Sequence, residues 1–252
     1  MKVSIITATF NSALTIENNL QSIKNQTYKN IEHIIIDGKS TDATLEKIKK
    51  YEKNIFKIIS EKDNGIYDAL NKGIENSNGE IICFLHSDDF FFNEYVIENV
   101  VKSFKKKPTD SLYGDLFYVD FNDTNKIIRY WKSQKFQRKL FEFGWMPAHT
   151  TFFVKKEIYE KFGKFNLDLK ISADYELMLR FLYKNHISTQ YLPEIIVKMR
   201  VGGKSNASIK NRIIANKEDK KAWKINNLKL PFYTIYLKPI RKIFQFFKKL
   251  KN

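Results

Sequence analysis

The chain has 252 residues, 43% of them hydrophobic, which is enough for one large α/β domain or for a domain with an appendage. Its single cysteine, Cys83, excludes a disulfide framework, and no apolar run approaches the roughly eighteen residues of a membrane-spanning helix. The net charge is +16, but residues 200–252 hold fifteen Lys or Arg and two acidic residues, so this tail carries +13. Nucleic acid and an anionic membrane surface are the ordinary partners of such a tail.

The first hundred residues alternate between strand patterns and helix patterns. Runs of β-branched and apolar residues predict strands, and apolar residues three or four positions apart predict helices. In chain order, strands are predicted at residues 2–10, 31–36, 56–59 and 81–85, and helices at 14–26, 43–51, 66–75 and 93–105. This alternation indicates βαβ units around a parallel sheet.

After Lys107 and Pro108 the alternation becomes irregular. Strands are predicted at residues 111–121, 126–131, 150–154 and 187–201, and helices at 134–143, 158–162, 174–183 and from 207 onward. The sequence therefore predicts one mixed α/β domain, residues 1–205, followed by a basic helical C-terminal extension, residues 206–252.

The predicted strand at 81–85 is followed by two adjacent carboxylates, Asp88 and Asp89. Ligands of open α/β sheets bind beyond the carboxyl ends of the strands, and neighbouring carboxylates repel unless a cation or hydrogen-bond donors offset them. A hard divalent ion takes oxygen ligands and usually keeps a substrate phosphate in its shell, so the pair is interpreted as a metal–diphosphate site. From the pair alone, the N-cap of the next helix is an equally ordinary interpretation.

Polar residues follow all four early strands, at what should be one edge of the sheet. They are Thr7, Thr9 and Asn11, then Asp37, Ser40 and Asp42, then Asp63 and Asn64, and finally Asp88 and Asp89. Carboxylates in such places accept hydrogen bonds from a ribose hydroxyl or a base N–H. Neither glycine-rich phosphate-binding motif occurs, so a metal at Asp89 is expected to neutralise the phosphates.

Four segments, in this order and spacing, resemble family 2 glycosyltransferases of the GT-A fold. They are residues 5–11 (IITATFN), 36–42 (IDGKSTD), 63–73 (DNGIYDALNKG) and 85–89 (LHSDD), within a likeness that runs from residue 3 to about residue 200. The resemblance implies a Rossmann-like nucleotide-binding half, residues 1–90, beside an acceptor-side half, residues 91–205. It also implies inverting transfer from a nucleotide sugar, commonly a UDP-sugar, with Mg²⁺ or Mn²⁺.

The resemblance also implies roles for single residues. It puts Thr7, Asp37 and Asp63 near the base, Thr9 and Asn11 in the same donor nucleotide site, Asp88 near the ribose and Asp89 on the metal. Residues 172–177 (SADYEL) resemble the late acidic motif that supplies the catalytic base, which is then Asp174.

The chain departs from the common family pattern at three positions. Asp37 stands alone where many members have two acids before the glycine, and His86 replaces a more usual Asn or Asp. Ala173 precedes Asp174 where a Glu is common, which leaves one candidate base. The first departure weakens the case for uridine.

A single carboxylate at Asp174 agrees with the chemistry of inversion. The acceptor hydroxyl loses its proton on one face of the sugar while diphosphate leaves from the other, so one general base is enough. A metal can stabilise the charge on the departing diphosphate. The structural alternative for Asp174 is an acid in the first turn of a helix, stabilised by the helix dipole.

Three further residues are candidate donor or acceptor contacts. His149 precedes a predicted strand and matches a family histidine, Trp145 can stack on a sugar ring, and Arg200 begins a basic loop that can cover the diphosphate. The alternatives are a structural histidine, a core tryptophan and a solvated turn.

The end of the tail has two contrasting faces on a helical wheel. One face holds Phe232, Tyr236, Ile240, Ile243, Phe244, Phe247 and Leu250, and the other holds Lys238, Arg241, Lys242, Lys248 and Lys249. This composition is typical of a helix lying in a membrane interface, and Pro239 is expected to split or kink it. The alternative is a helix that packs its apolar face on the domain.

These observations predict a cytoplasmic glycosyltransferase, peripheral on the inner face of the cell membrane. It would extend a saccharide or polyprenyl-diphosphate-linked acceptor, as in the bacterial O-antigen, capsule and exopolysaccharide enzymes that it resembles. A sugar nucleotidyltransferase, the enzyme alternative, needs a glycine-rich basic loop near the N-terminus, which is absent. A nucleic-acid-binding protein is disfavoured because the basic charge is confined to the tail and no recognition motif occurs.

Overall fold

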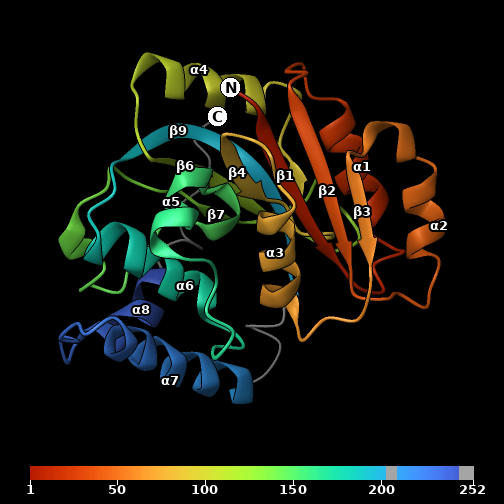
Figure 1. The fold of residues 1–252 in the computed structure, drawn as a ribbon. Coiled ribbons are helices and arrows are strands. Elements are labelled where there is room, and N and C mark those ends of the chain that lie inside the picture. Colours follow the sequence, from red (N-terminus) through yellow and green to blue (C-terminus); the bar gives the residue numbers. More distant parts are fainter. Residues whose placement is uncertain (203–208, 244–252) are drawn as a thin grey trace.

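The structure, a computed structural model, describes residues 1–202 and 209–243 (Figure 1). One mixed sheet of nine strands organises this part of the chain. The strand order is β3-β2-β1-β4-β8-β6-β9-β5, with β7 paired to β6. The strands are β1 (Val3–Thr9), β2 (Ile31–Asp37), β3 (Lys57–Ser60), β4 (Ile81–Phe84), β5 (Phe90–Phe91), β6 (Ser111–Val119), β7 (Ile127–Trp131), β8 (Phe153–Lys155) and β9 (Thr189–Arg200).

The first four strands form the parallel half of the sheet. Strand β1 pairs in parallel with β2 and with β4, and β2 pairs in parallel with β3. Every residue of β1 is buried, with Ile6 in the core cluster that includes helix α3 and Ile5 in the cluster that includes helix α4. Burial on both faces requires helices on both sides of the sheet, as Figure 1 shows.

Four helices cover this half. They are α1 (Ile16–Lys24), α2 (Thr44–Lys49), α3 (Ile66–Glu75) and α4 (Val96–Lys106). Helices α1 and α2 pack together over Ile35 of β2. The predicted strands and helices of residues 1–105 are therefore all present, with ends that differ by a few residues.

The second half adds antiparallel pairs and helices from the end of the chain. Strand β8 joins β4 to β6 in antiparallel fashion, and β9 then runs parallel to β6. The helices are α5 (Lys156–Phe162), α6 (Ala173–Met178), α7 (Ile209–Ile225) and α8 (Thr234–Ile243). Trp223 of α7 is buried in the same core cluster as residues of α3 and α6, so α7 is packed onto the body of the domain.

Three predicted elements differ from the observed ones. The predicted helix at 134–143 is only a 3₁₀ turn, Arg138–Leu140, preceded by extended backbone at Gln137. The predicted strand at 150–154 begins as a 3₁₀ turn, His149–Thr151, because the Thr151 hydroxyl donates to the Ala148 carbonyl at 2.8 Å and competes with strand pairing. The predicted helix at 174–183 is α6 continued by a π-helix, Leu179–Lys184.

The C-terminal predictions have mixed outcomes. Helix α8 continues through Pro239 to Ile243, so the proline does not end it. The predicted boundary between residues 205 and 206, and apolar-face residues Phe244, Phe247 and Leu250, lie outside the described residues. Within residues 1–202 and 209–243, no helix is long and apolar enough to cross a membrane.

Candidate active site

The parallel register aligns the ends of β1, β2 and β3 at one edge of the sheet. Thr9 pairs with Asp37, and Asp37 pairs with Ser60. Three of the four predicted polar groups therefore lie beside one another. The fourth group, Asp88 and Asp89, follows β4, which pairs with the other edge of β1. Such an edge, beyond the carboxyl ends of parallel strands, is where ligands bind in open α/β sheets.

Loops after β1, β2 and β3 are tied together by their own polar side chains. The Asp37 carboxylate is fully buried and accepts from the Ser40 backbone N–H at 3.0 Å and from the Ser60 hydroxyl at 2.6 Å. Asn11 Oδ1 accepts from the Thr41 backbone N–H at 2.9 Å. Asp37 and Asn11 thus hold the rim of the site in shape.

Asp63 belongs to the same rim, and its carboxylate leaves no room for a side chain at Gly38. A Cβ atom at Gly38 would stand 2.5 Å from Asp63 Oδ2, closer than two non-bonded atoms approach. The other oxygen, Asp63 Oδ1, accepts from the Gly65 backbone N–H at 2.9 Å. Only glycine at position 38 lets the half-buried Asp63 carboxylate rest against the loop after β2.

Thr7 lies beneath the rim, and Thr9 is buried within it. The Thr7 hydroxyl is fully buried, 3.0 Å from His33 Nε2 and 3.4 Å from Asn19 Oδ1. Burial lowers the pKa of His33 to about 3, so this histidine is neutral and its ring can share a hydrogen bond with Thr7. The Thr9 hydroxyl is buried without a hydrogen-bond partner among the described residues.

The loop after β4, which carries Asp88 and Asp89, is braced by Asn19 of helix α1. The Asn19 side-chain amide is fully buried and lies 3.3 Å, 2.8 Å and 3.1 Å from the carbonyl oxygens of Leu85, His86 and Asp89. One side chain therefore braces three carbonyl groups of the loop that carries Asp88 and Asp89.

Arg200 braces the same loop from strand β9. Its guanidinium donates to the Asp88 carbonyl at 2.6 Å, to Asn18 Oδ1 at 2.8 Å and to the Phe121 carbonyl at 3.2 Å. Arg200 is only 4% exposed, so its charge is directed into the base of the loop.

Asp89 has an unusual environment for a carboxylate. Its side chain is fully buried, and neither carboxylate oxygen has a hydrogen-bond partner in the described part of the chain. Burial and the neighbouring Asp88 raise its pKa well above the usual range, although Arg200 acts in the opposite direction. A buried carboxylate without a partner costs free energy that a bound cation would offset, so this residue fits a divalent metal.

The rest of a metal shell is not preassembled. Within residues 1–202 and 209–243, no three His, Cys, Asp or Glu side chains come together as a metal-binding group. A single buried carboxylate at the sheet edge fits an ion that takes most of its other ligands from a diphosphate and water.

Asp174 lies at the start of helix α6, where side chains from two other elements meet it. His149 Nδ1 is 3.4 Å from Asp174 Oδ2, and the Tyr67 hydroxyl of helix α3 is 3.2 Å from Asp174 Oδ1. Asp174 and His149 keep 23% and 27% of their side-chain surface exposed, so both can reach a substrate.

His86 connects this group to the loop after β4. Its ring centroid lies 5.9 Å from that of His149, and His86 is three residues before Asp89. Burial and then the neighbouring His149 lower the pKa of His86 to about 4, so it is neutral near pH 7. The late acidic motif and the Asp88–Asp89 loop therefore face one another across two histidines.

Trp145 is placed away from this group. It is 8% exposed and packs edge-to-face against Tyr113, with ring centroids 6.0 Å apart, inside the main core cluster. Trp145 therefore packs in the core, which was the structural alternative to stacking on a sugar ring.

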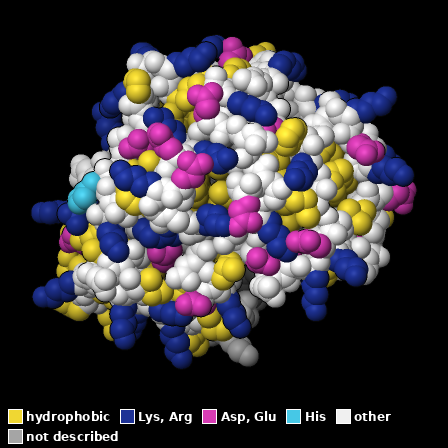
Figure 2. Space-filling model, viewed as in Figure 1, with side chains coloured by type: hydrophobic (Ala, Val, Ile, Leu, Met, Phe, Trp, Pro, Cys, Tyr) yellow, Lys and Arg dark blue, Asp and Glu magenta, His cyan; other side chains and the backbone are white. Residues whose placement is uncertain are grey.

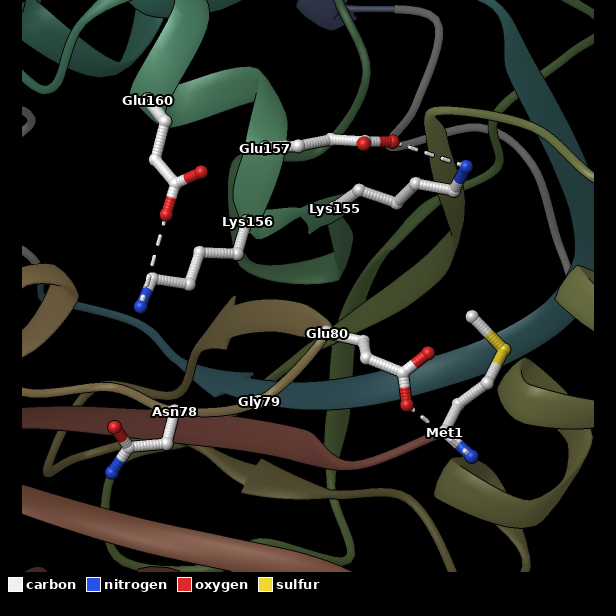
Figure 3. Close-up of a pocket in the computed structure, with 8 residues that line it drawn as sticks. All are labelled: Met1, Asn78, Gly79, Glu80, Lys155, Lys156, Glu157 and Glu160. Atoms are coloured by element: carbon white, nitrogen blue, oxygen red, sulfur yellow. Dashed lines mark ion pairs between the residues drawn. The ribbon is translucent and has the colours of Figure 1, made fainter.

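A separate shallow pocket lies at the opposite ends of β1 and β4 (Figure 3). It is lined by Met1, Asn78, Gly79, Glu80, Lys155, Lys156, Glu157 and Glu160. Its charges are mutually paired, with Lys155 3.3 Å from Glu157 and Lys156 3.9 Å from Glu160. Because these charges already have partners and the strands' carboxyl ends lie elsewhere, the candidate active site remains at the Asp89 edge.

Comparison with known proteins decides the family. The family model described as Glycosyl transferase family 2 matches residues 4–163. The chain belongs to this family. A PGL/p-HBAD biosynthesis glycosyltransferase of Mycobacterium bovis is 28% identical over 211 residues, 82% of this chain and 80% of the relative. A glycosyltransferase of Mycobacterium tuberculosis, described as uncharacterized, is 33% identical over 181 residues, 71% of this chain and 68% of the relative.

Solved structures support the fold of this glycosyltransferase. S. aureus TarS 1–349 in complex with UDP-GlcNAc superposes with a TM-score of 0.70 at 18% identity, covering 94% of this chain and 69% of the TarS 1–349 chain. The mannosyltransferase PcManGT from Pyrobaculum calidifontis, in complex with GDP-Man and Mn²⁺, gives a TM-score of 0.68 at 19% identity, covering 94% of this chain and 68% of that one. The predicted GT-A fold is confirmed.

Sequence patterns missed two residues that shape the site of this glycosyltransferase. They are Tyr67, which lies inside a family motif that assigns it no role, and Asn19, a polar residue in the predicted helix at 14–26. The one available signal for Asn19 is its place next to Leu20 and three residues after Ile16, on the side of the helix that must be buried.

We expect Asn19→Ala to destabilise the glycosyltransferase and loosen the loop after β4. Removing the amide leaves buried carbonyl groups without a donor, which costs about 1–3 kcal/mol of unfolding free energy. Urea denaturation measures the stability, and calorimetric titration with UDP and Mn²⁺ should show weaker binding. Gln21→Ala, an exposed change on the same helix, is the control and should stay within about 0.5 kcal/mol of the parent. Equal losses in the two variants would contradict the bracing role.

Proposed function

We propose that this chain transfers a sugar, with inversion, from a UDP-sugar to a hydroxyl of a saccharide or lipid-linked oligosaccharide during surface polysaccharide assembly, as in O-antigen, capsule or exopolysaccharide synthesis. The observation that carries the proposal is the meeting of a buried, unpartnered Asp89 with an accessible Asp174 across His86 and His149. The complexes of the two structural neighbours with UDP-GlcNAc and with GDP-Man and Mn²⁺ support a nucleotide-sugar donor.

The donor nucleotide would occupy the rim formed by the loops after β1, β2 and β3. Residues assigned to this site are Thr7, Thr9, Asn11, Asp37, Asp63 and Asp88. Asn11 is exposed and Asp63 half-buried, so they can contact the nucleotide directly. Thr7 and Asp37 are fully buried and hydrogen-bonded within the protein, so their part is to hold the rim. In this proposal residues 1–90 bind the donor and residues 91–205 the acceptor side.

Asp89 would hold Mg²⁺ or Mn²⁺ together with the donor diphosphate. When bound, such an ion supplies a positive charge that stabilises the departing diphosphate. The chain's own contribution is to hold the backbone of Asp88 and Asp89 in place through hydrogen bonds from Arg200 and Asn19. His86 is neutral near pH 7 and adds no competing positive charge beside it.

Asp174 would remove the proton of the acceptor hydroxyl as that oxygen attacks the anomeric carbon. Its carboxylate is partly exposed and oriented by His149 and Tyr67. Burial, with Asp174 nearby, raises the pKa of Tyr67 well above its usual value, so Tyr67 remains a hydrogen-bond donor. The single Tyr67 hydroxyl hydrogen is shared between the Ile171 carbonyl at 2.7 Å and Asp174 Oδ1 at 3.2 Å. Asp174 Oδ2, 3.4 Å from His149 Nδ1, is the oxygen that would take the proton.

A donor panel tests the function. With Mn²⁺ and lipid extracts as acceptors, we expect turnover of at least one UDP-sugar, measured as UDP release, and loss of turnover when EDTA removes the metal. Preference for GDP-mannose over every UDP-sugar would contradict the uridine assignment. Failure with all nucleotide sugars would contradict the proposed function.

Asp89→Asn tests the metal assignment in the same samples. Removing a buried charge without a partner should leave the metal-free protein at least as heat-stable as the parent. UDP with Mn²⁺ at about 100 times the dissociation constant should stabilise the parent by about 2.7 kcal/mol and the variant by much less. Thermal melts with Mn²⁺ and with EDTA measure both effects. Equal Mn²⁺-dependent stabilisation of parent and variant would rule out Asp89 as the metal ligand.

We expect Asp174→Asn to lower kcat by about 10²–10⁴-fold, because the amide keeps the size of the carboxylate but cannot accept the proton. The donor KM should barely change. Asp168→Asn, six residues earlier and exposed, removes the same charge outside the site and is the matched control. A variant at position 174 with near-normal turnover would refute the base assignment.

We also propose that helix α8 holds the enzyme on the inner, anionic face of the cell membrane, where a lipid-linked acceptor is presented. Phe232 and Tyr236 are 86% and 71% exposed, unusual for large aromatic side chains. Figure 2 shows basic and hydrophobic side chains along the lower edge of the molecule, where Figure 1 places α7 and α8. Lys238, predicted on the basic outer face, instead pairs with the buried Asp219 at 2.5 Å.

Exposed aromatic residues offer a test that leaves the fold intact. The double change Phe232→Ser and Tyr236→Ser should lower binding to phosphatidylglycerol-containing liposomes by about tenfold or more, since each aromatic ring buried in lipid contributes about 1.5–3 kcal/mol. Co-sedimentation at low and high salt measures it, because the basic contribution is screened by salt. Phe56→Ser, exposed before strand β3, is the control. Unchanged sedimentation of the double variant would refute this membrane contact.

A further inference from the structure

Helix α7 approaches the segment that carries Asp174 through one carboxylate. Glu218 accepts three backbone N–H groups in a row: Lys170 at 2.9 Å on Oε1, and Ile171 at 2.8 Å and Ser172 at 2.9 Å on Oε2. Glu218 is 9% exposed, so these bonds are shielded from water. An anion bound by consecutive N–H groups just before a helix also benefits from the helix dipole.

The same segment is held from its other side by the active site. The Ile171 carbonyl accepts from the Tyr67 hydroxyl at 2.7 Å, and that hydroxyl is 3.2 Å from Asp174 Oδ1. Glu218 and Tyr67 therefore clamp residues 170–172 between them. Ser172, whose side chain does not cap α6, donates its hydroxyl to the Ala215 carbonyl of α7 at 3.3 Å.

Helix α7 and the residue that follows it have independent anchors C-terminal to this contact. Trp223 is 1% exposed and its indole N–H donates to the Tyr175 hydroxyl at 2.8 Å. The Asn226 amide donates to Glu176 Oε1 at 2.8 Å. Because these contacts hold α7 on α6 without Glu218, the carboxylate is free to act on the loop alone.

We propose that Glu218 is a positioning residue for Asp174, so that the C-terminal basic segment completes the active site through helix α7. This inference rests on the proposed role of Asp174 as the base. Nothing in the sequence pattern suggested it, because Glu218 lies 44 residues after Asp174 among basic residues that resemble a tail. A displacement of a catalytic group by about 1 Å is enough to lower a rate by about 10²-fold, which is the scale on which such a clamp acts.

Glu218→Gln is the informative change. The amide nitrogen replaces one acceptor oxygen with a donor that faces backbone N–H groups, while size and burial are kept. We expect kcat to fall by roughly 10–100-fold with an unchanged donor KM, because the donor rim lies on other loops. Hydrogen–deuterium exchange of the amides at 170–172 should accelerate.

Asp219→Asn is the matched control on the same helix. Asp219 is also buried and pairs with Lys238, and in the described part of the chain no hydrogen bond joins its side chain to residues 170–172. It should lower the melting temperature without accelerating exchange at 170–172 and without a comparable loss of kcat. Equal kcat in Glu218→Gln and Asp219→Asn would overturn the proposal.

The double variant Glu218→Gln with Asp174→Asn separates positioning from general stability. If Glu218 acts through Asp174, the double variant should be no slower than Asp174→Asn alone. Multiplicative losses would overturn the proposal. If Asp174→Asn itself keeps near-normal turnover, the proposed base fails, whereas normal turnover of Glu218→Gln alone rejects only the positioning role.

Discussion

The parallel pairing of β1 with both β2 and β4 is the constraint on which the site depends. A strand that is hydrogen-bonded on both edges and buried on both faces cannot shift register without moving its whole apolar set. That register aligns Thr9 with Asp37 and Asp37 with Ser60, and the loops that follow inherit their positions. The rim formed by the loops after β1, β2 and β3 is therefore a consequence of sheet packing.

A second constraint is electrostatic. The core leaves Asp89 in a dry environment, and the Arg200 guanidinium donates its hydrogen bonds to the Asp88 carbonyl, Asn18 and the Phe121 carbonyl. The backbone around the carboxylates is fully braced while the Asp89 oxygens remain without a partner. A buried carboxylate held in this way fits a positively charged group, such as the divalent ion proposed above.

The catalytic side is assembled from distant parts of the chain. Tyr67 comes from α3, His149 from the turn before β8 and Glu218 from α7, and all of them act on a few residues around Asp174. Helix α7 packs the basic C-terminal segment against the residues just before Asp174, whereas α8 combines an inward ion pair at Lys238 with the exposed ring of Tyr236. One segment thus packs on the domain and also presents an exposed surface, so the two interpretations of the tail are compatible.

The sequence by itself determined the strand–helix alternation, the GT-A fold and the edge at which polar residues collect, because apolar periodicity and local motifs are properties of short segments. It did not reveal Asn19 or Glu218, because their hydrogen-bond partners are distant in the sequence. Leu85 lies 66 residues from Asn19, and Lys170 lies 48 residues from Glu218. It also misjudged residues 134–143, which form only a short 3₁₀ turn, and residues 150–154, where the Thr151 hydroxyl competes with strand pairing. Only the tertiary structure decided which polar residues face a substrate and which hold the backbone, because burial and hydrogen-bond partners arise when segments far apart in the chain pack together.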